Sequence, residues 1–111
     1  MDANLTVAVS QAVSVSGASP TAITIPARAN CRVVLLAVAS YPGSQNYNGV
    51  LVKETDASGT LLAYLGSETS AGPVRFSGII KGTLGTALYV AMETPQLNTN
   101  RLSVTYQYEH L

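Results

Sequence analysis

The stretch that decides the fold reads Arg32-Val33-Val34-Leu35-Leu36-Ala37-Val38-Ala39-Ser40. Nearly all of its side chains are apolar, several are β-branched, and the stretch is shorter than a typical helix. A continuous apolar run of this length is typical of a strand in the middle of a sheet. We therefore interpret residues 32–40 as a central strand that is covered on both faces.

On either side of this run, apolar and polar residues alternate, which is the period of a half-buried strand. The first alternating segment begins at Leu5 and continues to Val15. The last segment, from Arg101 to Tyr108, places its apolar side chains on one face. These side chains are Leu102, Val104, Tyr106 and Tyr108.

Glycine, proline and asparagine separate the runs and mark turns. The segment Thr55-Asp56-Ala57-Ser58-Gly59 predicts a hairpin, and Asn48-Gly49 predicts a turn with positive φ. Gly78 interrupts an alternating segment, so we expect a bulge or bend there at which the inward face switches. The expected strands cover residues 5–15, 22–25, 32–40, 50–54, 60–65, 73–80, 86–92 and 101–108.

About eight short strands separated by turns, with no convincing helical period, indicate an all-β fold. We predict a single-domain antiparallel β-sandwich, jelly-roll-like, over residues 1–111. Residues 1–16 are expected to form either an extended arm or edge strand that pairs with a neighbouring subunit, or an ordinary first strand of the sandwich. The predicted core consists of Val33, Leu35, Val38, Leu62, Phe76, Leu88, Val90, Leu102 and Val104.

The chain carries few charges. Only 11% of its 111 residues are charged and 47% are hydrophobic, whereas about a quarter of an ordinary globular sequence is charged. Lysine, which keeps surfaces solvated, occurs only at Lys53 and Lys81. Such a surface suits a subunit fixed in an assembly better than a freely diffusing enzyme, so we expect a binding or building role.

The charge balance also argues against nucleic acid as a partner. The formal net charge is zero and the pI is near 6.5, so the chain lacks the basic field that supplies most nucleic-acid affinity. The most apolar run, residues 33–39, is shorter than the roughly 20 residues that a membrane-spanning helix needs. No positively charged N-terminal region marks a signal peptide, and we expect the chain to fold in a cytoplasm.

Few residues could support catalysis. The only histidine is His110 and the only cysteine is Cys31, so a Cys–His nucleophile pair would have to combine these two. We expect neither to be catalytic and predict that the protein is not an enzyme. Glu54, Asp56 and Ser58 could offer oxygens to a cation, but an Asp that caps its own turn explains the pattern better. We expect no metal and no cofactor.

Tyrosine is the expected recognition residue, since the chain has six tyrosines and no tryptophan. Tyr41 and Tyr47 flank a loop rich in Gln and Asn, and Asn48 follows Tyr47 as a further candidate. A flat ring with a hydroxyl can dock on a protein or stack on a sugar. Tyr41 could equally end the central strand with its ring on the rim of the core. The other candidates for contact with a partner are Leu97 in a loop and Leu5, Val7 and Val9 in the first strand.

The length, the strand layout and the low charge together resemble those of the small decoration, or cementing, proteins of tailed-phage capsids. The staple proteins of epsilon-15-like short-tailed phages belong to this group. The residues that carry the resemblance are Leu5 to Val15, Val33 to Ala39, Asp56 to Gly59 and Arg101 to Tyr108.

This resemblance implies a structural protein of the virion, made in the host cytoplasm and placed on the outer capsid surface. It also implies binding to the major capsid protein. We further expect self-association as a dimer on the shell. The protein would bridge neighbouring capsid subunits and stabilise the shell against the pressure of the packaged DNA.

A second function stays open at this point, that of a carbohydrate-binding β-sandwich module of a phage tail or bacterial surface protein. It would use Tyr41 together with the loop residues Gln45, Asn46, Tyr47 and Asn48. The lack of tryptophan speaks against it, because aromatic stacking supplies much of sugar recognition. A glycan array would distinguish the two functions.

Overall fold

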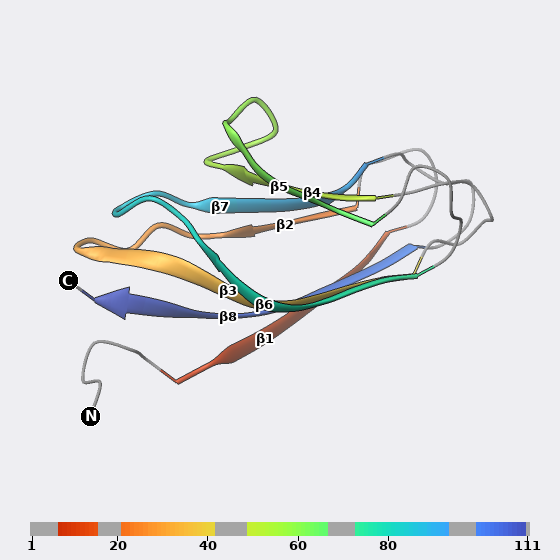
Figure 1. Ribbon diagram of the computed structural model, residues 1–111, viewed down its shortest axis with the longest axis horizontal. Coiled ribbons are helices and arrows are strands. Elements are labelled where there is room, and N and C mark those ends of the chain that lie inside the picture. The colour runs from red at the N-terminus through yellow and green to blue at the C-terminus, as the bar shows by residue number, and fades with distance from the viewer. Residues whose placement is uncertain (1–6, 16–20, 42–48, 67–72, 94–99, 111) are drawn as a thin grey trace.

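A computed structural model of the chain describes residues 7–15, 21–41, 49–66, 73–93 and 100–110. The strands of these residues form two sheets that face each other and appear as an upper and a lower layer in Figure 1. Turns and loops connect the strands. No helix that could cross a membrane occurs in these ranges. The strands are β1 (Val9–Val15), β2 (Ala22–Ile25), β3 (Cys31–Tyr41), β4 (Val50–Glu54), β5 (Leu61–Leu65), β6 (Val74–Lys81), β7 (Leu88–Met92) and β8 (Asn100–His110).

The order of the strands is that of a jelly roll. The first sheet has the order β1-β8-β3-β6 and the second has the order β2-β7-β4-β5. β1 pairs with β8, β2 with β7, β3 with β6, and β4 with β5, always antiparallel. This is the pattern of one long hairpin rolled so that successive strand pairs alternate between the two sheets. The predicted fold class, an antiparallel sandwich of jelly-roll type, is confirmed.

The predicted central strand is β3, which lies between β8 and β6 in the first sheet. On its core side, Val33 and Leu35 are at most 1% exposed. On its other side Val34 is also buried, but Ala37 and Ala39 are only half-buried. The prediction that the strand is covered on both faces is therefore wrong for its second half, where the neighbouring side chains leave the outer face of the strand partly open.

A bulge in β3 changes which of its residues face the core. Cys31 and Leu35 belong to the core before Leu36, and Val38 belongs to it afterwards. The register shifts between Leu35 and Ala37 against both neighbouring strands. The inward parity of the strand therefore switches at Leu36, as expected for one inserted residue.

The irregularity predicted at Gly78 lies directly across from this bulge. Leu35 pairs with Ile80 and Ala37 pairs with Ser77, so two residues of β6, Gly78 and Ile79, stand opposite the single residue Leu36 of β3. The expected switch of the inward face in β6 is wrong, because Phe76 and Ile80, which share one parity, both pack against the core. The ring of Phe76 fills the space at Gly78, where an added Cβ would lie 2.9 Å from the ring.

The hydrophobic core lies between the two sheets. Seven of the nine predicted core residues are at most 2% exposed, and Leu62 and Phe76 are partly buried against the same cluster. The core residues that the sequence did not predict lie mostly in the second sheet, whose short strands give few periods from which to judge the inward face. They include Ile23, Ile25, Val50, Val52, Val74 and Met92.

Truncation of a fully buried side chain tests this core. Leu102 is 0% exposed, and we expect Leu102→Ala to lower the free energy of unfolding by about 2 to 5 kcal/mol through lost burial and a new cavity. Leu61→Ala is the matched control, because Leu61 is 51% exposed. Urea unfolding followed by circular dichroism measures both variants. Equal effects of the two substitutions would contradict the assigned core.

Tyr108 closes the core at one end of β8. Its hydroxyl donates a hydrogen bond to the carbonyl oxygen of Pro26 at 2.6 Å. The guanidinium carbon of Arg28 lies 4.2 Å from the centre of its ring, and the ring of Tyr106 stands edge-on at 5.9 Å. Burial raises the pKa of the Tyr108 hydroxyl above 10.0, and the neighbouring Tyr106 raises it further while Arg28 lowers it.

This raised pKa predicts a loss of stability in alkaline solution. Above about pH 10 the unfolded chain releases the Tyr108 proton while the folded chain retains it, so the free energy of unfolding falls as the pH rises. The contribution is fully present below pH 10 and is lost as the pH passes through the raised pKa.

We expect Tyr108→Phe to flatten this alkaline decline. The variant also loses the hydrogen bond to Pro26, which lowers its free energy of unfolding at every pH. The test therefore compares how steeply the free energy of unfolding falls with pH in the two proteins, and not its absolute value. Urea midpoints at about pH 8 and about pH 11 measure the slope for both proteins. Parallel declines in the two proteins would contradict the assignment.

Candidate functional site

The first candidate site is the free edge of β1, the outermost strand of the first sheet. β1 pairs with β8 over its full length, from Val9 opposite Tyr106 to Val15 opposite Asn100, without a register shift. Its other edge pairs with no strand among the described residues. The backbone N–H and C=O groups on that edge are therefore available to another strand.

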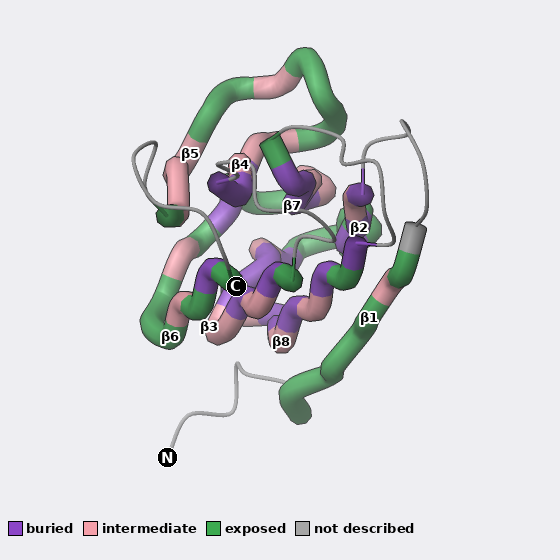
Figure 2. Tube along the Cα trace, turned by 90° about the vertical axis from the view of Figure 1, so that its right-hand side faces the viewer, coloured by how far each residue is buried: buried purple, intermediate pink, exposed green. Residues whose placement is uncertain are grey.

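The side chains of β1 are more exposed than a sandwich strand requires. Val9 lies on the core-facing side, opposite Tyr106, yet it is 46% exposed. Val7, just before the strand, is 86% exposed, whereas Val13 packs partly against the core. Figure 2 shows β1 at one margin of the sandwich, exposed along most of its length. At this margin the second sheet ends in β2, which is only four residues long and leaves the end of β1 uncovered.

The other sheet margins carry features that oppose pairing with another chain. β6 has Arg75 and Lys81 and the irregularity near Gly78. β5 has a register shift against β4, and the short β2 is followed by Pro26. β1, in contrast, contains no charged residue and no proline. Among the described strands it is the one edge without such protection.

The second candidate site is the outer face of the first sheet. Ala37 and Ala39 of β3 carry only methyl groups and floor a shallow depression of ≈ 300 Å³. Arg75 lines it from β6, and its guanidinium carbon lies 5.4 Å from the centre of the Tyr41 ring. Tyr41 is 38% exposed and stands opposite Arg101 of β8. One end of this face thus combines two cations with an aromatic ring.

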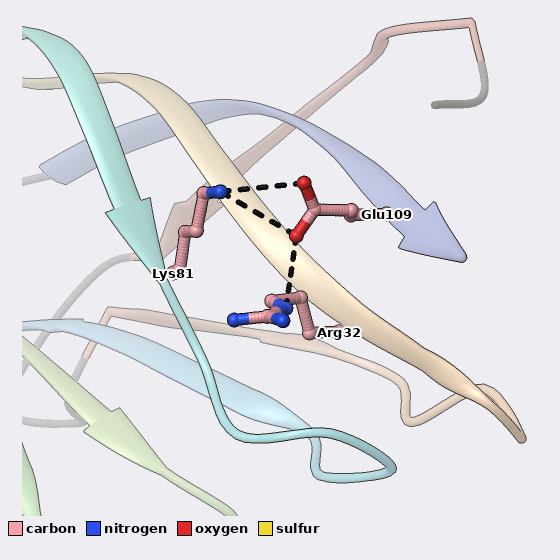
Figure 3. A network of polar contacts seen from close by, with 3 residues as sticks. All are labelled: Arg32, Lys81 and Glu109. Carbon is pink, nitrogen blue, oxygen red and sulfur yellow. Dashed lines mark hydrogen bonds and ion pairs between the residues drawn. The ribbon is translucent and has the colours of Figure 1, made fainter. Parts of the chain in front are cut away.

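At the opposite end of the same face, a carboxylate offsets part of the positive charge. Glu109 receives Arg32 and Lys81, whose nitrogens lie 2.9 Å and 3.3 Å from its carboxylate oxygens (Figure 3). These three side chains come from β8, β3 and β6, so they cross-link the first sheet. Since the residues are partly exposed, the network contributes little to stability.

The outer face of the second sheet carries several apolar side chains, which the sequence analysis did not predict. Leu51 lies beside Tyr64 of β5 and Ala91 of β7, and Lys53 lies between Leu61 and Tyr89. The hydroxyl of Tyr64 donates a hydrogen bond to Glu93 at 2.7 Å. Alternation along β4 could have indicated this face. In β5, however, one extra residue shifts the register against β4, so alternation alone does not show on which face Leu61 lies.

Three of the predicted contact residues are exposed in the structure, namely Tyr41, Val7 and Val9. They do not form one site. Tyr41 lies on the outer face of the first sheet, whereas the two valines lie at the β1 edge. The other candidates, Leu5, Tyr47, Asn48 and Leu97, fall outside the described residues, as do Gln45 and Asn46 of the carbohydrate hypothesis.

The structure places Cys31 and His110 directly opposite each other in the pairing of β3 with β8. Cys31 is 3% exposed and belongs to the core cluster, while His110 is exposed at the end of its strand. A nucleophile in this position would be closed off from a substrate.

The hairpin between β4 and β5 uses its carboxylates for internal hydrogen bonds. Asp56 accepts a hydrogen bond from the backbone N–H of Ser58 at 2.9 Å, which is the predicted turn cap. Glu54 accepts a hydrogen bond from the hydroxyl of Thr83. In the ranges that the structure covers, no group of three His, Cys, Asp or Glu residues could hold a metal ion.

No family model matches the chain, and a search of the curated proteins finds no relative.

Substitution of Cys31 and His110 tests whether either has a chemical role. We expect the His110→Ala and Cys31→Ser variants to bind the expected partner, the major capsid protein, as the unsubstituted protein does. The reason is that neither side chain reaches a candidate contact surface. Co-sedimentation with the partner measures binding, and thermal unfolding detects any loss of packing at Cys31. Lost binding in a variant that melts like the unsubstituted protein would contradict this expectation.

Proposed function

We propose that this protein is a non-enzymatic structural subunit that decorates the outer surface of a phage capsid. It associates with a second copy of itself and bridges neighbouring major capsid subunits. The observation that carries the proposal is the free edge of β1, an unprotected strand with exposed valines. Such an edge favours aggregation in a protein that diffuses freely, but it is useful in a protein whose role is to be built into an assembly.

β1 suits pairing with the same strand of a second copy. Strand addition draws its affinity from backbone hydrogen bonds, and small side chains allow close approach. In an antiparallel pair centred on Ala12, Ser10 faces Ser14 and Gln11 faces Val13. Each contact then occurs twice, once from each copy, as a two-fold axis requires. The resulting dimer would join two first sheets into one continuous sheet.

A dimer would bridge the shell because it presents each capsid-binding surface twice. The second contact then forms at the effective concentration set by the first, which is on the order of millimolar for closely linked sites. Modest contacts repeated over many positions can thus stabilise a shell. The low charge of the chain, 11% of its residues, fits a surface that is largely covered in the assembly.

The β1 edge is tested by placing lysines on it. We expect Val9→Lys with Gln11→Lys to convert the dimer into a monomer, because charge on an edge strand opposes pairing. Both positions are exposed, so the fold should persist. Thr24→Lys, which adds one lysine at an exposed position on the edge strand β2, is the control and should remain dimeric. Sedimentation equilibrium measures the mass, and a monomeric unsubstituted protein would refute this mode of association.

The capsid role is tested with phage shells that lack the decoration protein. We expect the unsubstituted protein to co-sediment with the shells and to raise the temperature at which they rupture, and the lysine variant to bind about tenfold more weakly or worse. Shells that bind none of the unsubstituted protein would refute the proposed function.

A chain that begins at Ala18 complements the lysine variant. It removes β1 altogether, including Val13, which packs partly against the core. If this chain unfolds, β1 is needed for the sandwich itself. If it stays folded by circular dichroism and loses self-association, β1 serves mainly in assembly.

A further inference from the structure

The depression on the outer face of the first sheet has apolar lining residues and three side chains that can donate hydrogen bonds, those of Arg75, Ser103 and Thr105. Ala37 and Ala39 form its floor, and the side chains at the same level on the neighbouring strands rise around it. The hydroxyl of Thr105 is already paired with that of Ser10, at 3.2 Å. On either side of Ala39 lie Ser103 and Arg75, so a hydroxyl and a guanidinium border the hollow.

The cations at this end of the face have no acidic partner among the described residues. Arg75 and Arg101 are both exposed, and neither lies within ion-pair distance of a carboxylate in the part of the chain that the structure describes. By contrast, Arg32 and Lys81 at the other end share Glu109.

The one described carboxylate on this face is too far away to neutralise the two arginines. Glu109 and Arg101 lie on the same strand eight residues apart, which is about 26 Å at the rise of a strand. At physiological ionic strength this distance exceeds the screening length of about 8 Å. Among the described residues, the end near Tyr41 therefore carries an excess of positive charge, although the net charge of the chain is zero.

The chemistry of the hollow favours a carboxylate over a phosphate. Phosphate sites usually draw on free backbone N–H groups at helix ends or in nests. Here the floor is a β-strand, in which Ala37 and Ala39 have partners on the strands at both sides. The planar guanidinium of Arg75 remains as the principal donor, and arginine pairs with carboxylates through two parallel hydrogen bonds.

We propose that this hollow and the adjoining Arg75, Tyr41 and Arg101 bind an acidic extended segment of the major capsid protein. A carboxylate of that segment enters the hollow at Arg75, and a second carboxylate pairs with Arg101. The apolar part of the segment contacts the exposed ring of Tyr41. The inference rests on the proposed function for the identity of the partner and adds the chemistry by which that partner is recognised.

The site and the β1 edge can be occupied at the same time. Pairing at the edge extends the first sheet sideways, whereas the hollow opens on the outer face over β8, β3 and β6. A dimer would therefore display two basic hollows, one from each copy.

Charge reversal at Arg75 tests the site. We expect Arg75→Glu and Arg101→Glu each to weaken binding to undecorated shells by about tenfold or more at low salt, and to leave the dimer intact. Lys53→Glu is the matched control, because it makes the same charge change on the other sheet, and it should bind within about twofold of the unsubstituted protein. Shell binding that is unchanged in both arginine variants would overturn the inference.

Filling the hollow provides a test without any change of charge. We expect Ala39→Leu to weaken shell binding, since the larger side chain occupies the space that a carboxylate needs. Thermal unfolding shows whether this variant is folded. A folded Ala39→Leu protein that binds shells normally would show that the hollow is not used.

A peptide titration separates this inference from the proposed function. A fluorescent oligoglutamate should bind the unsubstituted protein, and oligoglutamine should not. Arg75→Glu should abolish the binding. If shells fail to bind but oligoglutamate binds through Arg75, the capsid role is wrong and the carboxylate site stands. If oligoglutamate fails to bind, or inorganic phosphate or an acidic polysaccharide binds more tightly at Arg75, the acidic-segment site is refuted.

Discussion

The pairing of β3 with β8 is the constraint on which the rest of the structure depends. Both are long strands, they lie at the centre of the first sheet, and they align from Cys31 opposite His110 to Tyr41 opposite Arg101. The bulge at Leu36 lets this pair satisfy two demands. It keeps core side chains inward on both sides of the shift, and it leaves the small side chains of Ala37 and Ala39 on the outer face. The hollow beside Arg75 is thus a direct result of how the central strand accommodates one extra residue.

The two candidate surfaces lie on the same sheet but depend on different physics. The β1 edge offers backbone groups and exposed valines, so its affinity would be insensitive to salt. The basic end of the outer face offers charge, so its contribution would fall as salt rises. A decoration protein of the proposed kind would benefit from both, because steering by charge speeds encounter and strand pairing slows release.

The sequence predicted the fold class and most of the core because these depend on local periodicity. The alternation of β8 and the apolar run of β3 indicate their strands without knowledge of their neighbours. The site was predicted less well because it depends on register. Tyr41 was expected at a contact, but Arg75 and Arg101 were not associated with it, since only the pairing of β3 with β6 and β8 brings these residues together. The change of core-facing parity was likewise predicted in β6, at Gly78, whereas it occurs in β3, at Leu36. A glycine marks a candidate bulge in a sequence, but a leucine does not.

The pairing of β1 with β8 has a consequence for the order in which the chain folds. The hydroxyls of Ser10 and Thr105, which meet across these strands, are 95 residues apart in the sequence. During synthesis β1 must wait for β8, so the first sheet is completed last. Contacts between such distant residues make folding slow, because a long loop must close before they form. Until β1 and β8 have paired, β1 and the edge of β8 that it covers are both free. Two copies can then exchange their β1 strands, and this gives a domain-swapped dimer in competition with the monomeric fold.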